Sequence, residues 1–224
     1  MATGVVLSVA TDRTQGGASM VDGSVELMVH RRLQQDDRRG VGEPLNEPGL
    51  DAQGRGLIVR GVHRLSLDAP AAAAAAGKAA VQEMLYPLQL AFAAGAPAPA
   101  AGKGAFSGLA APLPPALHLL TAHARGPKEL LLRLAHLFEA GEDAALSAPV
   151  TLGLSGLFAG TTLSGCVEMT TPGIKPVAAV ATHTVSIIGE GSVTWPAIPA
   201  APAGPAQTVT IAAMEIRTWV CTAS

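Results

Sequence analysis

Residues 207–220 read QTVTIAAMEIRTWV, a stretch rich in the Thr, Val and Ile side chains that β-strands favour. Three earlier segments have the same character and are separated by short turns: 149–158 (PVTLGLSGLF), 161–170 (TTLSGCVEMT) and 182–188 (THTVSII). Strands at this close spacing are typical of an antiparallel sandwich or barrel. The second half of the chain is therefore predicted to be built of β-strands.

Strands are also predicted in the first half, at 4–10 (GVVLSVA), 24–33 (SVELMVHRRL) and 57–67 (LIVRGVHRLSL). In 24–33, apolar and polar residues alternate, which is the period of a strand with one half-polar face. Residues 36–56 combine acidic, basic, Gly and Pro residues and are predicted to form a long polar loop. A loop of this length is usually functional or supported by another domain.

One helix is predicted at 69–86, where alanine, the residue of highest helix propensity, predominates. We expect Asp68 to cap its start and Pro87 to end it. The Ala, Pro and Gly residues of 93–105 and 195–206 predict loops. The predicted fold is thus all-β with one inserted helix.

Residues 128–138 (KELLLRLAHLF) fit two periods. Helical spacing places Leu130, Leu134 and Leu137 on one side, and the local pattern favours this interpretation. Strand alternation instead places Leu132, Leu134, His136 and Phe138 on one face. The residues alone leave the choice between the two open.

Composition excludes several classes of protein. There are 15 Lys and Arg against 17 Asp and Glu, a net charge of −2, which argues against a nucleic-acid surface. No uninterrupted apolar run of membrane-spanning length is present, and residues 1–10 lack the basic and apolar regions of a signal peptide. A soluble, globular protein without a membrane span is expected.

Metal, thiol and catalytic motifs are also lacking. The six histidines form no HExxH pattern, so no zinc centre is expected from this chain. Cys166 and Cys221 are far apart in sequence; two buried or unpaired thiols are the favoured interpretation, and one disulfide is the alternative. No nucleophile motif occurs, and a carboxylate pair among the loop acids (Asp36, Asp37, Glu43, Glu47) is a remote alternative. From pattern alone, Arg31 or Arg32 is expected to form an ion pair with Asp36 or Asp37.

An ordered series of motifs resembles a known family. The series comprises DRTQGG (12–17), VELMVHRRL (25–33), DD (36–37), GVGEPLNE (40–47), GLIVRG (56–61), PLQLAF (87–92), LPP (113–115), HLL (118–120), LLRL (131–134), FEAGED (138–143) and MEIRT (214–218). It resembles glycoside hydrolase family 38, and more narrowly the C-terminal β-domain of lysosomal-type (acidic) alpha-mannosidases. The matches run in the family's order over nearly the whole chain.

The resemblance implies an antiparallel β-sandwich, galactose-mutarotase-like, with a strand rather than a helix at 128–138. It implies a β-sandwich domain at 1–145, carrying the loop 93–105, and a smaller terminal β module at 146–224 packed on it. Family enzymes hydrolyse terminal alpha-mannosyl residues of glycans with an N-terminal catalytic barrel that holds a zinc ion. That barrel is missing here, so no catalytic residue is carried over and this chain is not expected to bind the zinc.

The resemblance also implies the site residues. One of Arg31 and Arg32, with His30, is expected to reach the substrate, and strand alternation would allow only one of the two arginines to do so. Residues expected at the interface with the missing barrel are Asp12, Arg13, Gln15, Asp36, Asp37 and Glu43. The partners implied are mannose-containing glycans and the barrel, and the location implied is the lysosome, the vacuole or the secretory pathway. A stand-alone carbohydrate-binding or scaffold module without hydrolase activity is the alternative.

Overall fold

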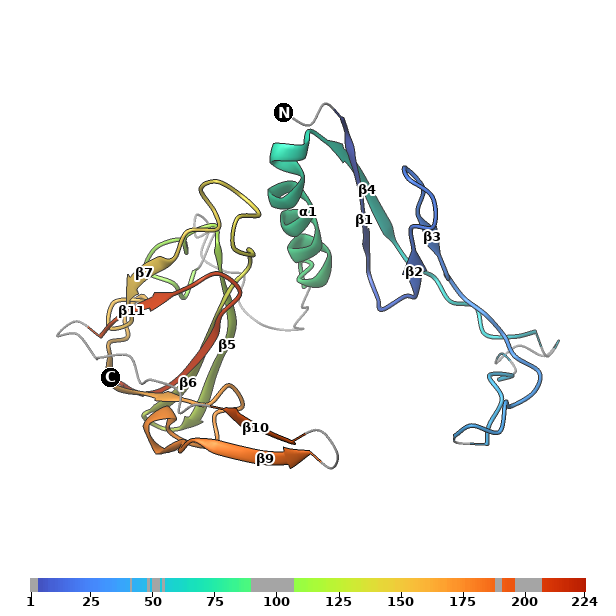
Figure 1. Ribbon diagram of the computed structural model, residues 1–224. Coiled ribbons are helices and arrows are strands. Elements are labelled where there is room, and N and C mark those ends of the chain that lie inside the picture. Colours follow the sequence, from blue (N-terminus) through green and yellow to red (C-terminus); the bar gives the residue numbers. More distant parts are fainter. Residues whose placement is uncertain are drawn as a thin grey trace, which may run out of the picture. The chain divides into compact units, whose positions relative to one another are not determined.

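A computed structural model describes residues 4–40, 42–47, 49, 53, 55–89, 107–187, 191–195 and 207–224 (Figure 1). Contacts divide the chain into two compact units, Met1–Ala91 and Phe92–Ser224, which are considered separately below. The predicted loop 93–105 and nearly all of 195–206 lie outside the described residues. The predicted domain boundary at 145/146 falls inside the second unit and stays a prediction.

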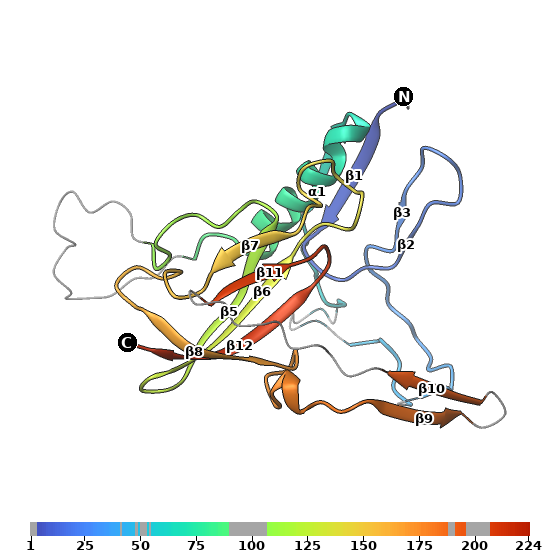
Figure 2. The ribbon, with the colours of Figure 1, turned by 60° about the vertical axis from the view of Figure 1, so that its left-hand side comes forward.

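The second unit is built of antiparallel β-sheets. Its largest sheet has four strands in the order β5 (Leu117–Gly126), β6 (Glu129–His136), β12 (Ile216–Ala223) and β8 (Leu163–Met169). Two-stranded sheets are formed by β7 (Val150–Gly153) with β11 (Thr208–Ile211), and by β9 (His183–Ile187) with β10 (Gly191–Trp195), as Figure 2 shows. A short 3-10 helix spans Val177–Ala179.

Strand β6 settles the ambiguity at 128–138 in favour of the strand. It pairs with β5 along one edge and with β12 along the other. Leu132 and Leu134 have no exposed surface, and His136 is also buried, as strand alternation predicts. The opposite face is covered as well, because the Arg133 guanidinium donates to the carbonyl oxygens of Thr171 (2.8 Å) and Pro172 (3.0 Å). Covering both faces explains why leucines follow one another here without strict alternation.

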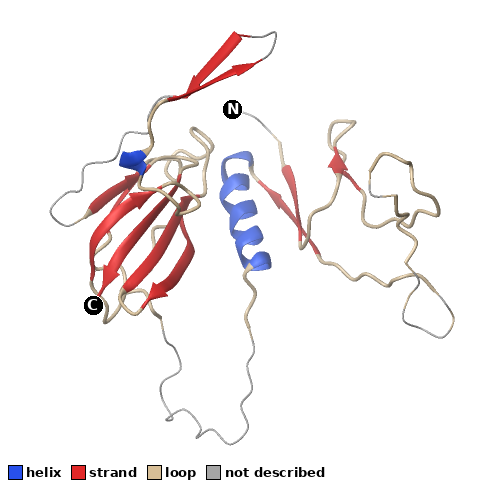
Figure 3. Cartoon of the chain, turned by 90° about the horizontal axis from the view of Figure 1, so that it is seen from below, coloured by secondary structure: helices blue, strands red, loops and turns tan. Residues whose placement is uncertain are grey.

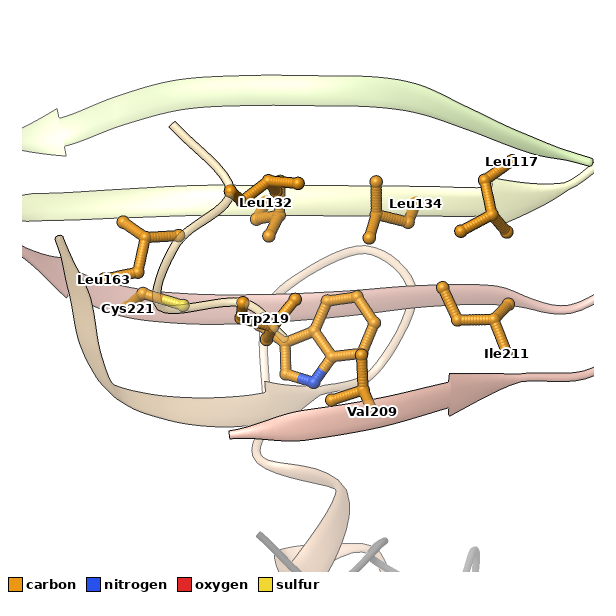
Figure 4. Close-up of a cluster of buried hydrophobic side chains, with 10 residues drawn as sticks. Leu117, Leu132, Leu134, Leu163, Val209, Ile211, Trp219 and Cys221 are labelled. Atoms are coloured by element: carbon orange, nitrogen blue, oxygen red, sulfur yellow. The ribbon is translucent and has the colours of Figure 1, made fainter. Parts of the chain in front are cut away.

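The core of this unit lies between the four-stranded sheet and the β7–β11 pair. Figure 4 shows the leucines of β5 and β6 beside Trp219 of β12 and Val209 and Ile211 of β11. Trp219 keeps only 2% of its surface exposed, and Ile211 none. Burying such large apolar side chains is the main favourable contribution to folding of this unit.

The two cysteines form a disulfide between β8 and β12. These strands are neighbours in the sheet, so residues 55 positions apart in sequence come to lie side by side. Cys221 is buried in the core cluster. The favoured interpretation from sequence, two unpaired thiols, is therefore wrong.

Two further expectations for this unit need correction. Residues 207–220 form two strands, β11 and β12, separated by a turn in which Met214 has a φ of 62° and the Glu215 N–H donates to the Ala212 carbonyl oxygen. The turn has neither Gly nor Pro, so no residue typical of a turn marks its position.

Strands β5 and β10 were not predicted as strands.

The first unit contains one antiparallel pair of strands and a helix (Figure 3). β1 (Val6–Thr11) pairs with β4 (His63–Asp68) in the register Val6↔Asp68 to Thr11↔His63. α1 (Pro70–Leu85) packs against β1 and β4, with Ala73 buried. β2 (Gly17–Ala18) and β3 (Glu26–Leu27) form a second, very short pair. The prediction of a chain made mostly of β-strands with one helix is confirmed.

Details of the first unit differ from expectation. The helix is capped by Ala69 without a side-chain hydrogen bond, so Asp68, which ends β4, is not its cap. Of the predicted strand 24–33, only Glu26–Leu27 pairs, and Val25 and Val29 are exposed. The described part of 36–56 contains no helix or extended strand, as predicted for a loop. Among the described residues, no helix combines the length and apolar character that crossing a bilayer requires.

Candidate functional site

Three segments of the first unit come together around a hollow of about 450 Å³. They are the turn that follows β1, the chain that follows β3, and the chain that leads into β4. The lining residues are Arg13, Gln15, Val29, His30, Val59, Arg60, Gly61 and His63. This larger hollow therefore brings together three of the residues predicted for the site, Arg13, Gln15 and His30.

An ion pair of adjacent residues fixes one wall of the larger hollow. Arg13 donates from Nε and Nη2 to the two carboxylate oxygens of Asp12, at 2.9 and 3.0 Å. The Val62 N–H donates to Asp12 Oδ2 (2.9 Å), and Arg13 Nη2 also donates to the Arg60 carbonyl oxygen. The Arg13 hydrogen bonds lower the pKa of Asp12 to about 2. Asp12 and Arg13 thus tie the turn after β1 to the chain before β4.

A polar contact joins the same two segments deeper in the hollow. His63 Nε2 lies 2.7 Å from Gln15 Oε1, a distance at which the imidazole N–H donates to the amide oxygen. The Met28 N–H donates to the Gly16 carbonyl oxygen (2.9 Å), which holds the chain that carries His30 beside this turn. The hollow is therefore held by hydrogen bonds rather than by an apolar core.

A smaller hollow of about 280 Å³ shares His30 with the larger one. Its lining residues are His30, Arg31, Arg32, Leu45, Glu47, Gly56 and Leu57. The Leu33 N–H donates to the Leu45 carbonyl oxygen (2.9 Å), which closes the loop between them. His30 thus lies between two cationic hollows.

The two arginines differ in their contacts. Arg32 Nε donates to Asn46 Oδ1 at 2.6 Å, and a Cβ on Gly56 would lie only 3.2 Å from Arg32 Nη1. Arg31 makes no hydrogen bond or ion pair within the described part of the chain. Both arginines line the smaller hollow, and residues 28–33 are not a strand, so strand alternation does not apply to them. Which of the two reaches the substrate stays a prediction.

The acidic residues of the loop have local roles. Asp36 Oδ2 accepts from the Arg38 N–H (2.7 Å) and Asp37 Oδ1 from the Arg39 N–H (3.0 Å), which are contacts that shape turns. The expected ion pair of Arg31 or Arg32 with these acids is not formed among the described residues. Glu43 is exposed.

The two hollows offer hydrogen-bond donors from arginine and histidine side chains, and the smaller one also offers the Glu47 carboxylate as an acceptor. Guanidinium and imidazole groups bind hydroxyl or carboxylate oxygens, and arginine offers two parallel donors. Within the described ranges, no group of three or more His, Cys, Asp and Glu side chains is arranged to hold a metal ion.

Sequence reasoning missed several residues of the larger hollow. His63, Arg60 and Gly61 belong to a segment predicted as a strand. Arg13 donates to the Arg60 carbonyl oxygen across 47 positions, and His63 contacts Gln15 across 48. The signal available was the motif GLIVRG at 56–61, which contains Arg60 and Gly61 but carries no recognisable chemistry by itself.

Curated relatives were found for this chain, whereas no family model matches it. The chain is 44% identical over 220 residues to the lysosomal alpha-mannosidase of Bos taurus, a match that covers 96% of this chain and 21% of the relative. It is 49% identical over 170 residues to the lysosomal alpha-mannosidase of Homo sapiens, covering 73% of this chain and 16% of the relative. An alpha-mannosidase of Canavalia ensiformis is 35% identical over 95% of this chain and 22% of its own length.

These matches show that the chain is similar to a region of alpha-mannosidases. More particularly, the chain is homologous to the C-terminal region of lysosomal alpha-mannosidases, which confirms the resemblance predicted from the motifs. It spans about a fifth of the length of the curated relatives that it matches over nearly its whole length.

Proposed function

We propose that the chain is the C-terminal β portion of an alpha-mannosidase that hydrolyses terminal alpha-D-mannosyl residues of glycans. The observation that carries this proposal is the 44% identity along 96% of the chain to an enzyme of that name. The reacting groups and the zinc would belong to the catalytic barrel, outside the fifth that this chain matches. This portion would complete the substrate cleft, and its sheets would form the sandwich of the family.

Within this proposal, Arg31 is the arginine that reaches the substrate. Arg32 is held by Asn46, at 2.6 Å, and would shape the loop. Arg31 lines the same hollow without a hydrogen bond or ion pair to other described residues, so its guanidinium is available to sugar hydroxyls. His30, which borders both hollows, would contribute a second donor.

The residues proposed for the interface with the barrel fall into two groups. Asp12, Arg13 and Gln15 are engaged in hydrogen bonds within the unit, so they would act by holding the wall of the larger hollow. Asp36 and Asp37 shape the loop that carries Glu43 and would present that exposed carboxylate to the barrel.

A chimeric enzyme tests the proposal. The matched C-terminal region of the bovine lysosomal alpha-mannosidase would be replaced by this chain, and hydrolysis of 4-nitrophenyl alpha-D-mannoside would be measured. We expect the chimera to be active and the enzyme truncated at the same point to be inactive. A folded, secreted chimera without activity would contradict the proposal.

Arginine variants of the chimera test the assignment within the site. Arg31→Ala removes a hydrogen bond from a charged donor, which corresponds to a loss of about 10- to 100-fold in kcat/KM, and Arg31→Lys should recover part of it. Arg125→Ala, an exposed arginine of the second unit, is the control and should leave kcat/KM unchanged. If Arg32→Ala lowered kcat/KM as much as Arg31→Ala at unchanged thermal stability, the assignment to Arg31 would be wrong.

A stand-alone carbohydrate-binding module is the second candidate function. It is favoured by the two hollows, which are formed by this chain without any other domain. It predicts that the isolated chain binds methyl alpha-D-mannoside in calorimetry without hydrolysing an aryl mannoside. Absence of heat at millimolar mannoside would count against the module.

The proposed location is the lysosome, the vacuole or the secretory pathway. The matched relatives include lysosomal alpha-mannosidases. The disulfide between Cys166 and Cys221 gives independent support, because disulfides form and persist mainly in oxidising compartments.

A further inference from the structure

The first unit has almost no apolar core of its own. Among its described residues, the only buried apolar side chains are the alanines Ala10 and Ala73, whereas all larger buried apolar side chains belong to the second unit. Most of the exposed large apolar residues of the described chain also lie in the first unit. A domain that leaves this much apolar surface uncovered needs a further layer to be stable.

Part of this apolar surface lies on one face of the β1–β4 pair, where Leu7, Leu65 and Leu67 are exposed. Side chains on the other face meet α1: Gly77 of the helix lies next to Ser8, and Arg64 forms an ion pair with Glu83 (2.6 Å). Because strand side chains alternate, the residues between these point away from the helix. They pair as Leu7↔Leu67 and Val9↔Leu65, which places four apolar side chains together; we call them the β1–β4 outer face.

Exposure and pairing both leave this face open. Leu65 is 64% exposed and Leu67 72% exposed. Within the described residues, β1 and β4 pair only with each other, so each strand has one edge without a partner. Isolated two-stranded sheets are marginally stable in water, and open edges pair readily with added strands.

We propose that the β1–β4 outer face is the docking surface for the rest of an alpha-mannosidase polypeptide, namely the part of the relatives outside the matched fifth. This inference rests on the proposed function. The match to the bovine enzyme covers 96% of this chain and only 21% of that relative, so strands β1 and β4 correspond to segments within a polypeptide almost five times as long. That polypeptide itself supplies the layer that covers the face, and a second copy of this chain is not needed.

Binding between two separately produced chains tests the surface. The bovine enzyme lacking the matched region would be immobilised, and binding of the 224-residue chain would be measured by surface plasmon resonance. Leu65→Glu and Leu67→Glu place a charge on the outer face, and we expect each to weaken binding by about tenfold or more. Ile174→Glu is the matched control, because Ile174 of the second unit is 74% exposed, and it should bind like the parent chain.

A second arm covers the case in which the truncated enzyme does not fold. In the chimera described above, Leu67→Glu should lower the midpoint of thermal unfolding, whereas Ile174→Glu should leave it unchanged. The proposed docking surface would be overturned if Leu65→Glu and Leu67→Glu both left the binding affinity unchanged, or both left the midpoint of thermal unfolding unchanged. If sedimentation showed a dimer of the isolated chain that Leu67→Glu dissociates, the occupant would be a second copy, and the proposal would be overturned as well.

Failure of the surface and failure of the proposed function give different results. If the chimera is active, and the outer-face variants change neither its midpoint of thermal unfolding nor the binding affinity, only the proposed docking surface is contradicted. Tight binding that the outer-face variants weaken, in a complex that hydrolyses no mannoside, supports the surface and contradicts the proposed function.

Discussion

Removing the disulfide should destabilise the second unit strongly. Cys166 and Cys221 are 55 positions apart, and the bond between them closes this loop in the unfolded chain. In the chain-entropy treatment, a loop of about 55 residues contributes about 4 kcal/mol to the free energy of unfolding at 25 °C. The bond also joins β8 to β12. Two residues of β12, Trp219 and Cys221, lie in the core.

The double variant Cys166→Ala/Cys221→Ala measures this contribution. Urea unfolding would be followed by tryptophan fluorescence, since Trp219 is buried and becomes exposed on unfolding. We expect a free energy of unfolding about 4 kcal/mol below that of the oxidised parent, and a similar loss when the parent is reduced with dithiothreitol. The variant in the oxidised and reduced buffers should give the same midpoint, which serves as the control.

Two results would contradict a stabilising disulfide in this unit. Alkylation of the unfolded, non-reduced parent should find no free thiol, so two alkylated cysteines would show that the bond does not exist. An unchanged urea midpoint after complete reduction would show that closing the loop does not stabilise this unit.

Three further perturbations act on single contacts. Leu134→Ala, at a fully buried position, should cost about 3 kcal/mol in the same urea titration, and a loss below about 1 kcal/mol would contradict its place in the core. Glu168→Gln weakens the two 2.7 Å hydrogen bonds from Arg217, a pair only 13% and 15% exposed, and should cost about 2 kcal/mol, whereas an unchanged midpoint would mean that the pair contributes nothing. The pKa of Asp12 lies below its ordinary value of 3.8, so its contribution is present above about pH 4 and is lost as the pH falls toward about 2. Hydrogen exchange at the Val62 amide should therefore be faster in Asp12→Asn than in the parent at pH 5, and the difference should vanish near pH 2; a constant difference would refute it.

Strand content was predictable from local composition, whereas the arrangement of strands was not. At 128–138 the leucine spacing fits a helix, and the outcome is decided by β5 and β12, which pair with both edges of β6. Hydrogen bonding to distant strands overrides local preference here. The division of 207–220 into two strands depends on a turn at Met214 that lacks the usual turn residues.

The disulfide shows a similar limit. A separation of 55 residues between two cysteines carries no information on pairing, because pairing requires that β8 and β12 be neighbours in one sheet. That adjacency arises from the topology of the unit and is not a local property of either segment.

Some residues that line the two hollows were named from the sequence, whereas the geometry of the hollows could not be predicted. The motifs pointed to His30, Arg31 and Arg32, and the structure places all three around neighbouring hollows. Arg32 donates to Asn46, which lies 14 positions away in a loop. Loops have no regular residue period, so this contact could not be predicted from the sequence pattern. His63 reaches Gln15 across 48 positions, so its place in the larger hollow could come only from the fold.

We propose that this chain is a portion of a larger mannosidase. Immunoprecipitation from an extract of the source organism, with an antibody raised against this chain, tests it most directly. We expect the precipitate to hydrolyse 4-nitrophenyl alpha-D-mannoside. We also expect it to contain a species several times heavier than 22.5 kDa, the mass of this chain, or fragments of such a species held together. A precipitate that contains only the 22.5 kDa chain and has no mannosidase activity would contradict it.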